Sequence, residues 1–221
     1  MDIRSSLLQS VLIIPAILVA FTIHSYAQAA VADRLGDKNP RAQGRLTLNP
    51  LAHVDLIGFL MILFIHFGWG KPVETNPRAY KNYYKDDLKV GVSGIIANLL
   101  TAVVFGIVFG IFNKIYLQFF QVNYIIASMG YILLIIINYV VSVNCMFGII
   151  NIIPIPGLDG FHIMRDLFPK FFYSVADSFY RYQLIILIAF IFPIFGGNSL
   201  ATFLVGIPSQ ALSNFLTSLV S

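Results

Sequence analysis

Charged side chains are scarce in this sequence. Of 221 residues, 14 are Lys or Arg and 10 are Asp or Glu, which is 11% of the chain. A soluble domain carries about 25%. Hydrophobic residues make up 58%, and the mean hydropathy is +0.82. This composition excludes a water-soluble enzyme, a nucleic-acid-binding module and a disordered chain. It predicts a protein that crosses a lipid bilayer several times.

Cysteine is almost absent as well. The single Cys145 excludes an intramolecular disulfide and a metal cluster built from several cysteines. Because it lies in an apolar run, we expect it to be a small packing residue. The net charge of +4 comes mostly from the loops around residues 34–45 and 71–89. Basic loops of a membrane protein usually meet anionic lipid, so we expect the lipid bilayer as a partner and no nucleic acid.

Long apolar runs separate the few charges. Five long runs contain no Asp, Glu, Lys or Arg: residues 5–32, 56–70, 90–113, 115–158 and 182–221. A helix crosses the hydrocarbon core with about 20 apolar residues. We therefore predict an all-α polytopic membrane protein with five or six transmembrane helices, organised as a single membrane domain over residues 1–221. The first helix is expected to end at Gly36, because glycine commonly follows a helix C-terminus.

A short segment after the first helix has the alternating pattern of a strand. Its residues are Arg45, Leu46, Thr47, Leu48 and Asn49. Alternation of polar and apolar side chains indicates a half-buried strand. We therefore expect an edge strand or a small membrane-associated β-hairpin at this place.

Three polar clusters interrupt the apolar sequence, and polar side chains within a membrane are costly enough to indicate function. His24 and Gln28 are four residues apart, so a helix places them on one face. His53 and Asp55 follow the sequence NPLA. Asp159 is an isolated acid in the helix-breaking sequence NIIPIPGLDG. Structural interpretations stand beside these: an interhelical hydrogen-bond pair for the first cluster, a helix cap at Asp55, and backbone hydrogen bonds at a helix start for Asp159.

Five sequence elements in a fixed order resemble the site-2 protease family. They are HSYAQAAVADRLGD, GRLTLNPLAHVD, GWGKPV, SGIIAN and NIIPIPGLDG. The similarity covers about residues 10–165 and leaves further C-terminal helices at about residues 182–218. It is closest to the compact bacterial branch of these intramembrane zinc metalloproteases, peptidase family M50. The resemblance implies a multi-pass protein of the bacterial cytoplasmic membrane that acts on single-span membrane proteins or peptides.

The resemblance also implies a zinc site, which in the family combines His-Glu-x-x-His with a distant Asp. Two His four residues apart bind zinc from one helix face, and the Glu activates a zinc-bound water. Carried over by position, His24 matches the first His and Asp159 matches the Asp. Ser25 stands in place of the Glu, and Gln28 stands in place of the second His.

These two replacements predict a degenerate site. A serine hydroxyl ionises far above neutral pH and does not replace a carboxylate base, and a glutamine amide rarely binds zinc. Zinc is the cofactor that the resemblance implies, and the replacements predict weak or absent binding. In an alternative arrangement, His53 supplies the missing imidazole beside His24 and Asp159, with Asp55, Asp33 or water as the base.

The substrate-binding elements of the family are better preserved than its catalytic ones. Asn151 matches a family Asn beside the substrate cleft, and the edge strand expected at residues 45–49 would hold an extended peptide by strand addition. The leading interpretation is therefore a protease homologue without peptide hydrolysis that binds transmembrane segments. An active zinc endopeptidase with a rearranged site is the second, and a small transporter is the third.

Overall fold

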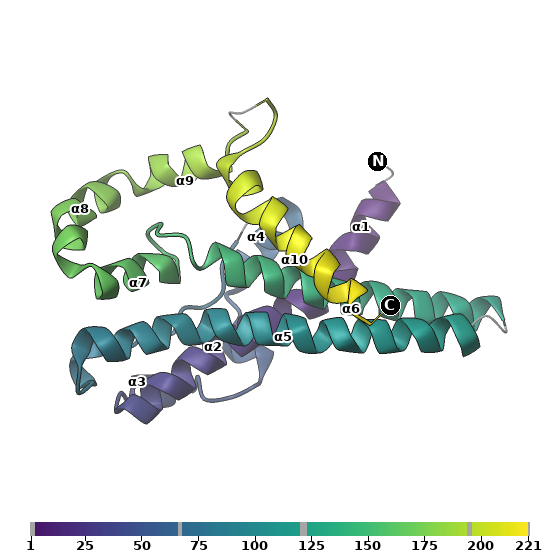
Figure 1. The fold of residues 1–221 in the computed structure, drawn as a ribbon, viewed down its shortest axis with the longest axis horizontal. Coiled ribbons are helices and arrows are strands. Elements are labelled where there is room, and N and C mark those ends of the chain that lie inside the picture. Colours follow the sequence, from purple (N-terminus) through teal and green to yellow (C-terminus); the bar gives the residue numbers. More distant parts are fainter. Residues whose placement is uncertain (1–2, 66–67, 120–122, 194–195, 221) are drawn as a thin grey trace.

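The computed structural model of the protein describes residues 3–65, 68–119, 123–193 and 196–220. Every regular element within these ranges is helical (Figure 1), as the composition predicts. The α-helices are α1 (Ile3–Leu12), α2 (Ile14–Leu35), α3 (Asn39–Ala42), α4 (Leu56–Ile65), α5 (Tyr83–Phe119), α6 (Tyr124–Ile150), α7 (Asp159–Leu167), α8 (Pro169–Arg181), α9 (Gln183–Ile191) and α10 (Ile207–Ser218). Short helical turns are η1 (Pro50–Ala52), η2 (Pro77–Ala79) and the π-helical η4 (Thr202–Gly206).

The centre of the molecule is formed by α2, α5, α6 and α10. Helix α5 packs most extensively against α6 and then against α2, while α10 lies across both α5 and α6 (Figure 1). One buried cluster joins α2 to α6 through Ala16, Ile17, Ala20, Phe21, Val140 and Val143. Cys145 is fully buried in a second cluster with α5 and α10, which confirms its expected packing role.

Helix α5 turns a row of small and polar residues toward its neighbours. The row has a spacing of four residues, which is close to one helical turn: Gly94, Asn98, Ala102, Gly106 and Gly110, all buried. A methyl group added at Gly106 would lie 3.0 Å from the Leu216 carbonyl oxygen. Small residues allow membrane helices to approach closely, and this row serves that purpose here.

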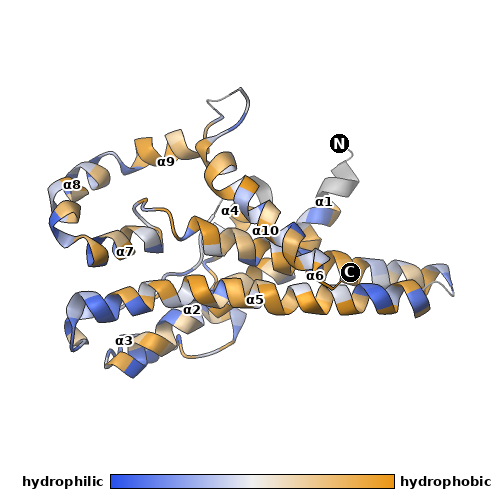
Figure 2. Ribbon diagram, in the orientation of Figure 1, coloured by the Kyte–Doolittle hydropathy of each residue, from blue (hydrophilic) through white to orange (hydrophobic). Residues whose placement is uncertain are grey.

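Three helical stretches within the described residues are long and apolar enough to cross a membrane, and a fourth is possible if the bent pair α8–α9 counts as one span. The three are residues Leu8–Leu35, Tyr83–Phe119 and Tyr124–Ile150, and α8 and α9 meet at 79°. Figure 2 shows apolar residues over the middle of the long helices and hydrophilic residues near the ends of α5.

The prediction of five or six spans is therefore wrong for the described chain. Helix α4 has 10 residues and α9 has 9, so each is about 15 Å long or less, against a hydrocarbon core of about 30 Å. Apolar composition alone overestimated the number, because it does not show where a helix is interrupted. In the C-terminal run, Gly196 and Gly197 adopt left-handed backbone with φ values of 58° and 89°, which separates α9 from α10.

The predicted strand is also absent: within the described chain, residues 45–49 are irregular, with a bend at Leu46 and Thr47. The buried Arg45 donates hydrogen bonds to the carbonyl oxygens of Ala52 and Pro72, the latter at 3.0 Å. His53 Nε2 contacts the Thr47 carbonyl oxygen at 2.7 Å. Within residues 45–49, the Thr47 carbonyl oxygen and the Asn49 N–H are therefore bonded to side chains instead of to a neighbouring strand.

Gly36 ends α2 as predicted. It has a left-handed φ of 115°, and its N–H donates to carbonyl oxygens of the last helical turn. The predicted cap at Asp55 is confirmed as well, since its carboxylate accepts a hydrogen bond from the N–H of Gly58 at 2.8 Å. Local sequence signals thus placed both helix ends correctly.

Candidate functional site

His24 and Gln28 face the first residue of α7. Gln28 Nε2 donates a hydrogen bond to Asp159 Oδ1 at 2.8 Å, and His24 Nε2 lies 2.9 Å from Asp159 Oδ2. The second contact lacks hydrogen-bond geometry, so no residue that the structure describes donates a hydrogen bond to the buried Oδ2 atom. The structure therefore brings three of the sequence-predicted site residues together, from segments 131 residues apart in the chain.

Two asparagines behind His24 extend the site into the bundle. His24 Nδ1 contacts Asn98 Oδ1 at 2.6 Å, and Asn98 Nδ2 donates to Asn144 Oδ1 at 2.8 Å. Both asparagines are fully buried, one on α5 and one on α6. Sequence reasoning assigned neither of them to the site. The signal that marks Asn98 is its place in SGIIAN, one helical turn after a glycine in an otherwise apolar helix.

Gly94 makes room for the imidazole of His24. A Cβ atom at this position would lie 2.6 Å from both Cε1 and Nε2 of the His24 ring. No side chain larger than hydrogen fits there without moving the ring. Gly94 and Asn98 are four residues apart on α5, so one face of this helix provides both the space and the polar contact for His24.

The break after α6 places Asp159 at the start of α7. Gly157 has a left-handed φ of 96° and turns the chain. At Gly160, a Cβ atom would lie 2.3 Å from the carbonyl oxygen of Ile152, so only glycine allows this close return. Asn151 caps α6, is buried, and donates from its side chain to the Phe147 carbonyl oxygen at 3.0 Å. Its predicted role in substrate binding stays a prediction.

A buried ionic cluster holds the other end of α7 against α5. Arg165 pairs with Asp87 of α5 and, at 2.8 Å, with Asp166 beside it in the chain. The guanidinium also lies 5.6 Å from the centre of the Tyr83 ring. Burial raises the pKa of the Asp166 carboxyl to about 6, although Arg165 opposes this shift. Helix α7 is thus fixed at its two ends by polar contacts to α2 and α5.

His53 takes part in the loop rather than in the site. It is fully buried, and its Nε2 contacts the Thr47 carbonyl oxygen. Burial lowers the pKa of His53 below its ordinary value. The base candidates of the rearranged site are also engaged elsewhere: Asp55 caps α4, and Asp33 pairs with Arg41 at 2.8 Å.

The residues present do not fit a catalytic zinc ion. Such an ion needs three protein ligands and an open position. Within the described part of the chain, no three His, Cys, Asp or Glu side chains lie close enough together to hold a metal. His24 Nε2 and Asp159 Oδ2 offer two ligands, and the third neighbour is the Gln28 amide, which donates to Asp159. Ser25 is buried next to His24 in the chain and supplies no carboxylate.

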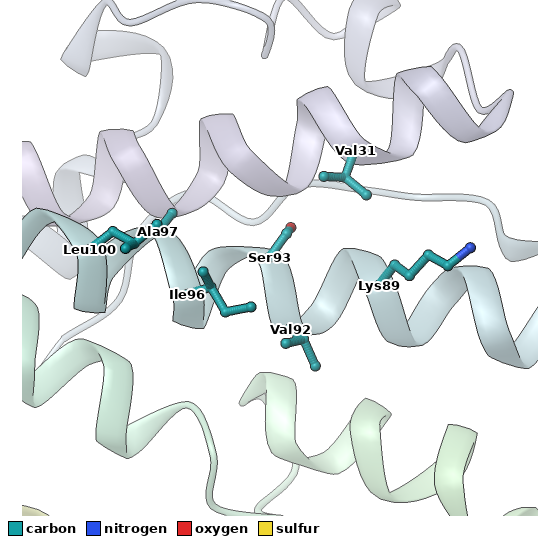
Figure 3. Close-up of a pocket in the computed structure, with 7 residues that line it drawn as sticks. All are labelled: Val31, Lys89, Val92, Ser93, Ile96, Ala97 and Leu100. Carbon is teal, nitrogen blue, oxygen red and sulfur yellow. The ribbon is translucent and has the colours of Figure 1, made fainter.

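An apolar groove of about 420 Å³ runs along α5 beside the end of α2 (Figure 3). Its lining residues are Val31, Lys89, Val92, Ser93, Ile96, Ala97 and Leu100. We call this surface the α2–α5 groove. It is carried by the same two helices that hold His24 and Asn98, although neither of these residues lines it.

Comparison with known proteins identifies the family of this chain. Residues 16–194 match the peptidase family M50. A Bacillus subtilis (strain 168) protein named "Putative zinc metalloprotease YwhC" is 33% identical over 153 residues, which is 69% of this chain and 67% of that protein. No solved structure matches the chain. The family match covers most of the chain and includes His24, Asn98 and Asp159. This integral membrane protein therefore belongs to peptidase family M50, the site-2 protease family.

Proposed function

We propose that this M50-family protein has lost peptide hydrolysis and binds transmembrane segments of single-span membrane proteins. It would do so as a multi-pass protein of the bacterial cytoplasmic membrane. Zinc would bind weakly or not at all. The observation that carries the proposal is the hydrogen bond from Gln28 to Asp159. The Gln28 amide makes this bond at the position where a zinc site would require a second imidazole.

The chemistry of the replaced residues supports the loss of hydrolysis. A water molecule attacks an amide only after a base or a metal has activated it. The Ser25 hydroxyl is too weak a base to activate water at neutral pH, and Asp159 already accepts a hydrogen bond from Gln28. His24 and Asp159 remain in contact, and together with Gln28 they join α2 to α7. In the proposed function this contact is structural.

The α2–α5 groove supports the binding of a membrane segment. Its exposed residues are apolar on the part of α5 that lies in the candidate span, and Ile96 and Leu100 are 49% and 60% exposed. Lys89 lies at one end. An apolar helix that contacts the groove would leave its polar flank near this cation, which is the arrangement found at the ends of transmembrane helices.

Metal analysis tests the loss of the zinc site. The purified chain should contain far less than one zinc ion per molecule, and Ser25→Glu with Gln28→His should raise the content to about one, since His24 and Asp159 are already placed. Adding Asp159→Ala to that double variant should remove the metal again. One zinc per unaltered chain, lost in Asp159→Ala and accompanied by cleavage of a single-span substrate, would favour the active endopeptidase and overturn the proposal.

Photo-crosslinking tests the binding of membrane segments. A crosslinking side chain at Leu100, in the groove, should capture a single-span membrane protein in proteoliposomes. The matched control carries the same group at Ile111, which lies on the same helix, is 50% exposed and does not line the groove. Equal capture at the two positions would show nonspecific contact within the bilayer and would contradict a binding role for the groove.

A further inference from the structure

The polar contacts behind His24 form one chain with a fixed direction. Asn144 Nδ2 donates to the Val140 carbonyl oxygen at 2.8 Å, and a carbonyl oxygen only accepts. Asn144 therefore turns Oδ1 toward α5, where it accepts from Asn98 Nδ2 at 2.8 Å. Asn98 Nδ2 also donates to the Ala20 carbonyl oxygen at 3.1 Å. Two backbone carbonyl groups thus fix the orientation of both side-chain amides.

The orientation of the Asn98 amide determines which ring nitrogen of His24 carries a proton. Asn98 Oδ1 lies 2.6 Å from His24 Nδ1, and an amide oxygen has no proton to give. A flipped Asn98 would place its oxygen against the Ala20 carbonyl oxygen, so two acceptors would face each other. The proton of this hydrogen bond therefore belongs to His24 Nδ1. His24 Nε2 is left as the nitrogen that faces Asp159.

We propose that Asn98 and Asn144 are positioning residues that keep the proton of a neutral His24 on Nδ1, so that Nε2 is the nitrogen that faces Asp159 and takes up the second proton when the ring pairs with an ionised carboxylate. The tautomer of a histidine is set by the hydrogen bond that its other nitrogen makes. Free histidine in water favours the opposite tautomer, so the fold reverses the ordinary preference. The inference does not depend on whether the chain hydrolyses peptides.

Burial explains why the two asparagines determine which nitrogen of His24 carries the proton. Both are fully buried where α2, α5 and α6 meet, so no bulk water is available to satisfy a bare Nδ1 atom or an unpaired amide. An unpaired polar group in an apolar environment is costly, so the arrangement in which the Nδ1 proton and the amide N–H groups of both asparagines meet acceptors is strongly favoured. Asn144 acts through Asn98, because it has no contact with the imidazole among the described hydrogen bonds.

Nitrogen-15 NMR of histidine-labelled protein in liposomes tests this inference directly. The shifts of Nδ1 and Nε2 report which nitrogen carries the proton, and loss of signals in His24→Gln assigns them. Spectra are recorded in the Asp159→Ala background at about pH 8.5, two units above the ordinary histidine pKa of about 6.5, so that the ring is neutral. We expect the Nδ1-protonated tautomer to dominate by at least about tenfold, which corresponds to about 1.4 kcal/mol.

Four substitutions separate positioning from a general structural effect. Asn98→Leu, which has a similar shape but no acceptor, should shift the population toward the Nε2-protonated tautomer. Asn98→Asp keeps an acceptor and should retain the original tautomer, whereas Asn144→Ala should give a smaller shift, since the bond from Asn98 to Ala20 remains. Thr101→Val is the control, because Thr101 lies on the same helix and its hydroxyl, among the described residues, bonds to the Ala97 carbonyl oxygen of its own helix.

Two results would overturn the inference. One is a bare Nδ1 on His24 in the unaltered chain, where the network requires a protonated Nδ1 in either charge state of the ring. The other is an Asn98→Leu spectrum identical to that of the background chain. If Asn98→Leu does not fold, the unaltered chain, Asn98→Asp and Asn144→Ala still decide the question, because the first two should show the Nδ1-protonated tautomer and Asn144→Ala a partial shift away from it.

Discussion

The space at Gly94 gives a sharp prediction about the packing of His24. In Gly94→Ala, the new methyl carbon would lie 2.6 Å from Cε1 and Nε2 of His24. Carbon atoms pack best at about 3.5–4.0 Å, so the ring must move by about 1 Å. It has little freedom to do so, because Asn98 contacts one nitrogen and Asp159 lies against the other.

The expected loss of stability follows from two opposing effects. Adding a methyl group to a filled site costs about 1–3 kcal/mol. Replacing glycine by alanine within a helix returns about 0.5–1 kcal/mol. We expect a net loss of about 0.5–2 kcal/mol in the free energy of unfolding, together with separation of His24 from Asp159.

Gly206→Ala is the matched control for this substitution. A methyl group there meets no atom closer than 3.9 Å, so only the favourable helix effect should remain. The free energy of unfolding is measured by SDS titration in mixed micelles, with circular dichroism as the signal. Equal stability of the two alanine variants would refute the assigned contact between Gly94 and His24, because both would then carry only the backbone effect.

Two further perturbations probe the polar groups outside the membrane-spanning helices. Asp166 has a pKa of about 6 in the folded chain because it is buried, against 3.8 ordinarily, so its contribution to stability is full below about pH 4 and is lost as the pH rises through 6. Asp166→Asn should remove this dependence in thermal unfolding measured from about pH 4 to 8, and an unchanged profile would contradict it. Arg45→Lys should cost about 1–3 kcal/mol and speed hydrogen exchange of residues 71–76, because one ammonium does not replace two guanidinium nitrogens that bond to Ala52 and Pro72. The exposed Arg41→Lys serves as its control and should change stability by less than about 1 kcal/mol.

Local signals in the sequence predicted several features correctly. The four-residue spacing of His24 and Gln28 places both on one face of α2, where they meet the same carboxylate. Gly36 and Asp55 mark helix ends, because left-handed backbone and side-chain capping depend on neighbouring residues only. The ordered motifs indicated the M50 family, which the family match over residues 16–194 confirms.

Other predictions failed because they depended on contacts distant in the chain. Residues 45–49 have the alternation of a strand, but His53 contacts the Thr47 carbonyl oxygen, and the buried Arg45 binds main-chain carbonyl groups at Ala52 and Pro72. The apolar runs were counted as spans, whereas α4 and α9 are too short to cross a bilayer. Alternation and hydropathy describe the environment that a segment tolerates, and they do not specify its partner.

The sequence by itself determined that this protein lies in a membrane and which family it belongs to, and its motifs predict that Ser25 and Gln28 stand in place of the family base and second zinc ligand. These are properties of residue identity and short spacing. Only the tertiary structure decided that Gln28 bonds to Asp159 across 131 residues and that Asn98 meets His24 across 74. Hydrogen bonds of this kind require two helices at the right distance and rotation, and that geometry arises only when the bundle packs.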